Sequence, residues 1–334
     1  MFASSFSTVR STSWARYLGI FALVASVGAG LLLVLQLRIT SCSGYGYGPD
    51  AYLAQCAAPE YGDYEHGALG LLVEGKAIDH LQRAQVIVLG HSHALVGFST
   101  PSTGRYFGAK DIPFYNASLS GEYSRFYDFL LPKLRLNAKV IVIDVALLLG
   151  GEHISSTGRF IIEQPIRSLL EYRIKQAWQL IHRHACSGTQ AAAQVFCGHR
   201  FSTFRSVIDG SLIADYTRVY GSPLPKYPVA RGMYAPLESE SRIKLAGEFL
   251  SRHRFHAACT ILTAIPTGID LSDLARTIAV ALNTRYINPL VGDLTTIDGA
   301  HLDTPSALAW SKQFWTEATP IVDRCVLMGT EPGR

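Results

Sequence analysis

The sequence predicts an α/β fold in which a parallel sheet of five strands is covered by helices on both faces. Short apolar runs alternate along the chain with amphipathic stretches, as in successive βαβ units. In the strongest runs, residues 85–89 and 139–144, four apolar residues follow one another without alternation, which is typical of strands buried on both faces. At 334 residues and 48% hydrophobic content, the chain is long enough to bury a sizeable core.

The predicted elements follow one another in a regular order until the middle of the chain. The strands are expected at residues 85–89, 113–116, 139–144, 259–265 and 284–287. Helical spacing of apolar residues is found at 67–82, 122–136, 272–282 and 304–319. From about residue 148 to 238 the alternation stops, and we expect an insertion over one edge of the sheet that contributes substrate selectivity.

The N-terminal region predicts a membrane anchor. Residues 17–35 carry no charge, and at about 1.5 Å per residue such a helix would span roughly the hydrocarbon core of a bilayer. Arg10 and Arg16 precede this stretch, which favours a cytoplasmic N-terminus. We therefore expect a single-pass inner-membrane protein with its C-terminal domain on the periplasmic side. The predicted parts are a cytoplasmic tail (1–16), a transmembrane anchor (17–37), a linker and leading helix (38–84), and a domain over 85–325 with its insertion at about 148–238.

The six cysteines all follow the predicted anchor, and an even number in an oxidising compartment favours disulfides. Fifteen pairings are possible. Proximity along the chain favours Cys42–Cys56 and Cys186–Cys197, which leaves Cys259–Cys325. No CxxC spacing is present, so we expect no zinc site, and no other metal or cofactor is indicated. The net charge of +4 gives no case for binding nucleic acid.

Five polar or flexible residues follow the ends of predicted strands. Ser92 follows the first strand, Asn116 and Gly121 follow the second, and Asp298 and His301 come soon after the fifth. The carboxyl ends of parallel strands meet at one edge of a sheet, where ligands bind, so these residues are expected to converge. A serine beside a histidine that an aspartate orients is the arrangement of serine-based acyl chemistry.

Three further polar residues lie near the predicted nucleophile. His91 and His93 flank Ser92 and are expected to face the loop or the substrate. A metal site at these two histidines is less favoured, because no acidic cluster accompanies them. Asp144, at the end of the third strand, either lines the site or caps the following turn.

In these segments the chain resembles the SGNH (GDSL-type) hydrolase superfamily. The resemblance covers about 85–148 and 258–320 and is carried by three motifs: Gly90-His91-Ser92, Asn116-Ala117-Ser118-Leu119-Ser120-Gly121 and Asp298-Gly299-Ala300-His301. It implies a flavodoxin-like three-layer sandwich around a five-stranded parallel sheet. It also implies Ser92 as nucleophile, His301 as base and Asp298 as the residue that orients it. The N–H groups of Ser92 and Gly121, helped by Asn116, would form the oxyanion hole.

One family motif is missing. The Gly-x-Asn-Asp block, whose asparagine donates to the oxyanion, has no counterpart, and its position falls near Leu147. With the predicted anchor, this makes the chain more similar to membrane-anchored SGNH-like proteins that partner polytopic membrane-bound O-acyltransferases, as in alginate acetylation or teichoic-acid D-alanylation.

That resemblance implies an envelope-facing O-acyltransferase. It would take an acyl group, most simply acetyl, from a polytopic membrane partner and pass it through acyl-Ser92 to a cell-surface polysaccharide. Two alternatives stay open: an anchored carbohydrate or lipid esterase, and a catalytically degenerate scaffold or binding module of a polymer-export complex.

Overall fold

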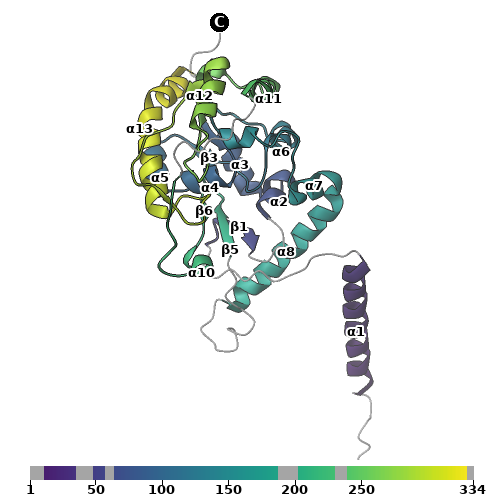
Figure 1. Ribbon diagram of the computed structural model, residues 1–334. Coiled ribbons are helices and arrows are strands. Elements are labelled where there is room, and N and C mark those ends of the chain that lie inside the picture. Colours follow the sequence, from purple (N-terminus) through teal and green to yellow (C-terminus); the bar gives the residue numbers. More distant parts are fainter. Residues whose placement is uncertain (1–10, 35–47, 57–63, 187–201, 230–238, 329–334) are drawn as a thin grey trace, which may run out of the picture.

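A computed structural model of the chain describes residues 11–34, 48–56, 64–186, 202–229 and 239–328 (Figure 1). Its central feature is a five-stranded parallel sheet in the order β3-β2-β4-β8-β9. The strands are Phe114–Asn116, Val86–Leu89, Val140–Asp144, Thr260–Thr263 and Arg285–Tyr286, in that order across the sheet. Numbered along the chain, this is the 2-1-3-4-5 order of a doubly wound sheet. The order reverses between β2 and β4, which is where such sheets bind their ligands.

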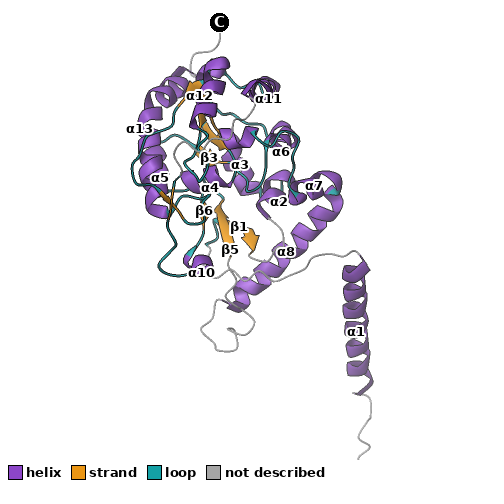
Figure 2. Ribbon diagram, in the orientation of Figure 1, coloured by secondary structure: helices purple, strands orange, loops and turns teal. Residues whose placement is uncertain are grey.

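Alternate residues of each strand contribute to two cores, one on each face of the sheet. In β2, Ile87 and Leu89 belong to one core, whereas Val86 and Val88 belong to the other. The first core is covered by α2 (Tyr64–Gly70), α3 (Gly75–Arg83), α6 (Ser124–Leu130), α11 (Ser239–Arg252) and α12 (Ser272–Ala281). The second is covered by α4 (Ser92–Phe98), α5 (Pro101–Lys110) and α13 (Thr304–Met328) (Figure 2). The apolar residues of β2 and β4 are consecutive because both faces of these strands are buried.

All five predicted strands are present, but several element boundaries differ from the prediction. The predicted helix 67–82 is two helices, α2 and α3, and Leu72 between them adopts a left-handed φ of 55°. The predicted helix 122–136 is α6 followed by a 3₁₀ turn, η2 (Leu131–Lys133). Pro132 lies in that turn and has no N–H to donate, so the α-helical pattern ends there.

Part of the predicted linker forms a strand that pairs with the insertion. Residues 38–84 contain β1 (Ala51–Cys56), which pairs antiparallel with β5 (Ser202–Ser206) of the insertion. Strand β5 pairs in turn with β6 (Leu212–Ile213), giving a second, three-stranded sheet. The described part of the insertion also contains α7 (Ser156–Glu163), α8 (Pro165–Cys186), α10 (Thr217–Tyr220) and β7 (Tyr227–Pro228), and the 3₁₀ turn η3 (Val145–Leu148) leads into it. Strand β7 pairs with β10 (Thr295–Thr296), close to the predicted Asp-x-x-His motif.

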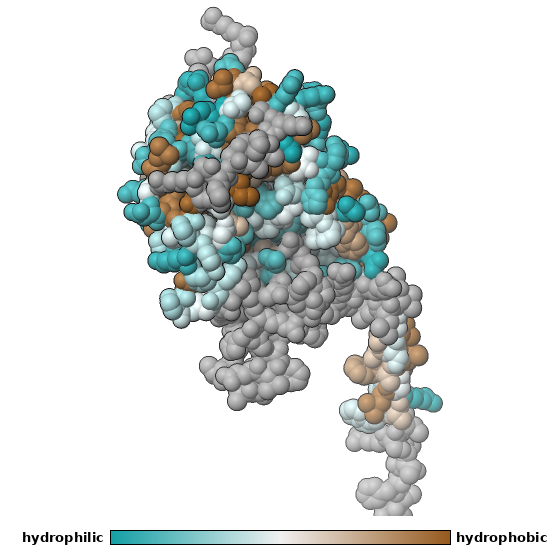
Figure 3. All heavy atoms as spheres, viewed as in Figure 1, coloured by the Kyte–Doolittle hydropathy of each residue, from teal (hydrophilic) through white to brown (hydrophobic). Residues whose placement is uncertain are grey.

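The expected membrane anchor is not found. Among the residues that the structure describes, no helix is both long and apolar enough to cross a membrane. The predicted transmembrane segment 17–37 and the single-pass inner-membrane localisation that followed from it are therefore wrong. A crossing helix needs about 20 consecutive apolar residues. Helix α1 (Ser11–Val34) contains Arg16. Figure 3 shows hydrophilic as well as hydrophobic side chains along this helix.

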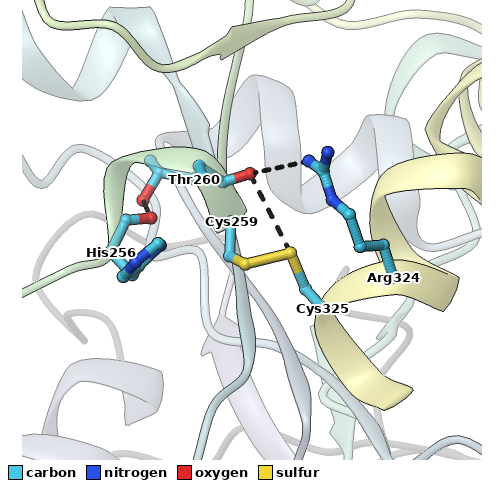
Figure 4. Close-up of a disulfide and its surroundings, with 6 residues drawn as sticks. His256, Cys259, Thr260, Arg324 and Cys325 are labelled. Atoms are coloured by element: carbon cyan, nitrogen blue, oxygen red, sulfur yellow. Dashed lines mark hydrogen bonds between the residues drawn. A yellow bond between two sulfur atoms is a disulfide. The ribbon is translucent and has the colours of Figure 1, made fainter. Parts of the chain in front are cut away.

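The structure contains the expected Cys259–Cys325 disulfide. It joins the chain just before β8 to the last turns of α13, and the two Cα atoms lie 5.9 Å apart (Figure 4). The Arg324 guanidinium also donates to the carbonyl of Ala258 at 3.3 Å. The other two expected pairs, Cys42–Cys56 and Cys186–Cys197, each include a cysteine that lies outside the described residues.

Candidate active site

The turn between β2 and α4 places Ser92 at the carboxyl edge of the sheet. Strand β2 ends at Leu89, and α4 begins at Ser92 with His91 as its N-cap. Gly90 is required in this short turn. A Cβ at this position would lie 2.4 Å from the Cβ of Ala94 and 3.0 Å from that of Asp144. The sequence therefore needs a glycine here for the chain to pass directly from a buried strand into a helix.

Ser92, His301 and Asp298 form a continuous chain of hydrogen bonds. The Ser92 Oγ lies 2.8 Å from Nε2 of His301, and His301 Nδ1 lies 2.7 Å from Oδ2 of Asp298. Because a carboxylate only accepts hydrogen bonds, His301 carries its proton on Nδ1 and leaves Nε2 to accept from the serine hydroxyl. The three side chains thus have the geometry of nucleophile, general base and orienting acid.

The Asp298 carboxylate is held by several donors. Its Oδ1 accepts the N–H groups of Ala300 at 2.9 Å and His301 at 2.8 Å, and Tyr220 donates its hydroxyl to Oδ2 at 3.2 Å. Burial raises the pKa of Asp298, but the hydrogen bond and charge of His301 and the two N–H donors together hold that pKa well below its ordinary value. Gly299 occupies the turn with a φ of +82°, a conformation that glycine adopts without strain. The carboxylate is therefore ionised and fixed.

A second and a third imidazole surround the serine. His91 Nδ1 lies 2.9 Å from Ser92 Oγ, and the His93 ring lies 5.3 Å from that of His91 and 5.5 Å from that of His301. Burial, followed by the charge of His301, lowers the pKa of His91 to about 4 and that of His93 to about 3. Both rings are neutral at neutral pH. In the described part of the chain no group of histidine, cysteine or acidic side chains is placed to hold a metal ion.

The side chain of Asn116, which was expected to help form the oxyanion hole, is bonded to backbone groups. Its Nδ2 donates to the carbonyls of Ala94 at 3.3 Å and Leu95 at 3.2 Å, and its Oδ1 accepts the N–H of Ser118 at 3.2 Å. The amide hydrogens therefore fasten the end of β3, and with it the loop that follows, to α4. Gly121 lies in the same loop with a φ of +72°. Its role as an oxyanion donor stays a prediction.

Sequence reasoning missed a buried ion pair that holds this loop. Arg205 of β5 is fully buried, and its Nη1 donates to Glu65 Oε2 at 2.8 Å and to the Ser118 carbonyl at 2.9 Å. Its Nη2 also donates to the carbonyl of Asn116. Glu65 in turn accepts the N–H of Ser120 at 2.7 Å. The pair joins residues 140 positions apart, so no sequence spacing indicates it.

A cavity of about 310 Å³ opens beside the triad. The wall includes Ser92, Asp298 and His301, and the insertion contributes Thr203, Leu212, Tyr216 and Tyr220. The cavity wall includes Ser120 but, within the described residues, not its neighbour Gly121. A larger cavity of about 640 Å³ lies beyond the ends of β8 and β9, between residues 264–272 and 288–294, and contains none of the triad. The smaller cavity is therefore the candidate substrate site.

Comparison with models of protein families, with curated proteins and with solved structures finds no match to this chain. The resemblance to SGNH hydrolases thus rests on the three motifs and stays a prediction. The structure itself defines an α/β protein that carries a Ser–His–Asp triad at the carboxyl edge of its parallel sheet.

Proposed function

We propose that this protein is a serine-dependent enzyme that transfers an acyl group through an acyl-Ser92 intermediate to a carbohydrate hydroxyl. The observation that carries the proposal is the hydrogen-bond chain from Ser92 through His301 to Asp298, at 2.8 Å and 2.7 Å. A scaffold or binding module has no need of this geometry. Ser92 and His301 are 209 positions apart, so folding alone brings them together.

The first half-reaction acylates the enzyme. His301 Nε2 takes the proton of Ser92 Oγ as that oxygen attacks the carbonyl carbon of the donor. Asp298 keeps the imidazole in the correct tautomer and stabilises the imidazolium. His301 then gives the proton to the leaving group as the bond between the acyl carbon and that group breaks.

The second half-reaction releases the acyl group. His301 takes the proton of an acceptor hydroxyl, the acceptor oxygen attacks the acyl carbon, and the proton returns to Ser92 as its bond to that carbon breaks. With water as the acceptor, the same steps make the protein an esterase. The identity of the acceptor is therefore the difference between the two functions.

The cavity supports a small acyl group and a polar acceptor. A volume of about 310 Å³ lies at the lower end of the range of small-molecule pockets and suits acetyl better than a long acyl chain. Gln55, Thr203, Tyr216 and Tyr220 line the wall and offer groups that bind hydroxyls. We therefore propose acetyl transfer to a sugar hydroxyl of a polysaccharide. Supply of the acyl group by a polytopic membrane partner stays a prediction.

The test is turnover of 4-methylumbelliferyl acetate by the full chain and by two variants. Ser92→Ala is expected to abolish turnover, and Asp298→Asn to lower kcat by about 10⁴, because the histidine tautomer is lost. Ser251→Ala, on the exposed surface of α11, is the matched control and should behave as the wild type. Turnover by Ser92→Ala at the wild-type rate would refute the proposal.

A second measurement separates transfer from hydrolysis. The same donor is supplied with and without an oligosaccharide, and both free acetate and acetylated sugar are quantified. A transferase diverts acetyl from water to the sugar as the sugar concentration rises. Acetate release that is unchanged by the sugar, with no acetylated product, would assign the protein to the esterases.

A further inference from the structure

The Ser92 hydroxyl contacts two imidazoles, although it has only one proton to donate. His301 Nε2 lies 2.8 Å from Oγ and His91 Nδ1 lies 2.9 Å from it. Two acceptor nitrogens cannot both be satisfied by one hydroxyl hydrogen. One of the two histidines must therefore donate to Oγ rather than accept from it.

The network decides which histidine is the donor. Asp298 accepts from Nδ1 of His301, so Nε2 of that ring has a lone pair and takes the serine proton. The contact with His91 is then stable only if Nδ1 of His91 carries a hydrogen and donates it to Oγ. Burial lowers the pKa of His91 to about 4, so this ring is neutral at neutral pH and carries a hydrogen on only one of its two nitrogens. Packing against Tyr123, with ring centroids 5.1 Å apart, holds its orientation.

The proposed reaction needs a side-chain donor that the expected residues do not supply. The position of the family's oxyanion asparagine falls near Leu147, which is apolar and fully buried. The Asn116 amide is already bonded to the carbonyls of α4. A negative charge that develops on the acyl oxygen would therefore lack the side-chain donor that related sites use.

We propose that His91 is a catalytic residue that donates its Nδ1–H to the oxyanion of the acyl-transfer reaction. This inference rests on the proposed function of Ser92 as the nucleophile. Oγ forms a bond to the acyl carbon, its proton moves to His301 Nε2, and the carbonyl electron pair moves to the oxygen. That oxygen shares the acyl carbon with Oγ, so the His91 hydrogen bond passes from one oxygen to its neighbour. His91 transfers no proton. The charge disappears when the carbonyl re-forms and the leaving group departs.

Two variants of equal size separate this role from simple orientation of the serine. His91→Asn places an N–H donor close to the position of Nδ1, whereas His91→Asp places an acceptor there. Either side chain can hold the serine hydroxyl by a hydrogen bond, but only asparagine can donate to an oxyanion. His153→Leu is the control, because the ring of His153 also packs against Tyr123, with centroids 5.3 Å apart, but His153 is exposed.

The measurement is kcat and KM for 4-methylumbelliferyl acetate, together with the affinity for methylboronic acid, whose tetrahedral adduct with a serine places a hydroxyl at the oxyanion position. His91→Asp should lose about 10²–10³ in kcat with little change in KM, the usual effect of removing one oxyanion donor. Its affinity for the boronic acid should fall by a similar factor. His91→Asn should keep kcat within about tenfold of the wild type, as expected when one donor replaces another.

Equal rates for the two His91 variants would overturn the inference, whether both are active or both are inactive. Ser92→Ala, measured beside them, distinguishes this failure from that of the proposed function. If Ser92→Ala is inactive while His91→Asp is fully active, the nucleophile stands and the role of His91 falls. If Ser92→Ala is as active as the wild type, both proposals fall together.

Discussion

Replacing Arg205 by methionine removes a buried cation on which the loop beside the active site depends. The guanidinium of the wild type is fully buried and bonds to the Glu65 carboxylate, whose side chain is only 3% exposed. Methionine fills a similar length without any donor. Glu65 would then stay in the interior without its cation, and the carbonyls of Asn116 and Ser118 would lose a charged donor.

The size of the effect follows from the burial of the pair. Removing one partner of a buried ion pair costs about 3–5 kcal/mol, because the other charge stays in the interior without compensation. Glu65→Gln leaves the buried Arg205 cation without its anion but keeps an acceptor for the Ser120 N–H, so its cost should fall at the lower end of this range, about 3 kcal/mol. The double variant should cost less than the sum of the two, since it leaves neither charge alone. We expect a coupling of about 1–3 kcal/mol.

Urea denaturation, followed by tryptophan fluorescence, measures these free energies. With a slope of about 3 kcal/mol per M, Arg205→Met should lower the midpoint by roughly 1 M. Arg276→Met is the control, because Arg276 is 62% exposed and its ion pair with Asp273, at 3.9 Å, is worth less than about 1 kcal/mol. The reasoning is refuted if Arg205→Met costs no more than this control, or if the costs of the two single variants simply add.

Four further predictions concern a buried carboxyl group, the disulfide and two glycines. Burial raises the pKa of the Asp144 carboxyl group from 3.8 to about 7. The neutral carboxyl group therefore makes its full contribution to stability below pH 3.8, and this contribution is lost as the pH rises through 7. The unfolding free energy of Asp144→Asn minus that of the wild type should therefore grow between pH 4 and 7, and a flat difference would contradict this. Replacing Cys259 and Cys325 by serine should lower the free energy of unfolding by about 4 kcal/mol, because the disulfide closes a loop of 66 residues. Thermal unfolding measures this loss, and an unchanged melting temperature would contradict the prediction. Gly90→Ala should lower esterase kcat by about 10², since its Cβ has no room and displaces the nucleophile. By contrast, Gly104→Ala in α5, where space is free, should gain about 0.5–1 kcal/mol of stability.

The sheet and the triad residues were predictable because both leave local signals. A strand buried on both faces needs a continuous apolar run, as in residues 86–89 and 140–143. Parallel strands joined by helices bring their carboxyl ends to one edge, so residues after different strands meet there. Ser92, Asp298 and His301 could be proposed together on this ground, and the structure brings all three within hydrogen-bond distance.

Local patterns were weaker where a segment depends on a distant partner. The stretch before residue 64 belongs to the predicted linker, yet it contains β1, whose hydrogen bonds come from β5 of the insertion. An uncharged stretch predicted a membrane anchor that the described helices do not provide. The composition of a segment does not record the distant strand with which it pairs.

The sequence by itself determined the parallel sheet, the glycine turn that presents Ser92, and the motif that carries Asp298 and His301, because each depends on neighbouring residues. Only the tertiary structure decided that Arg205 meets Glu65 and that Asn116 gives its amide to α4. It also decided that His91 is the second imidazole on the nucleophile. Two side chains become hydrogen-bond partners only when the fold of the whole chain brings them together. The spacing of residues within one segment therefore does not predict such a pair.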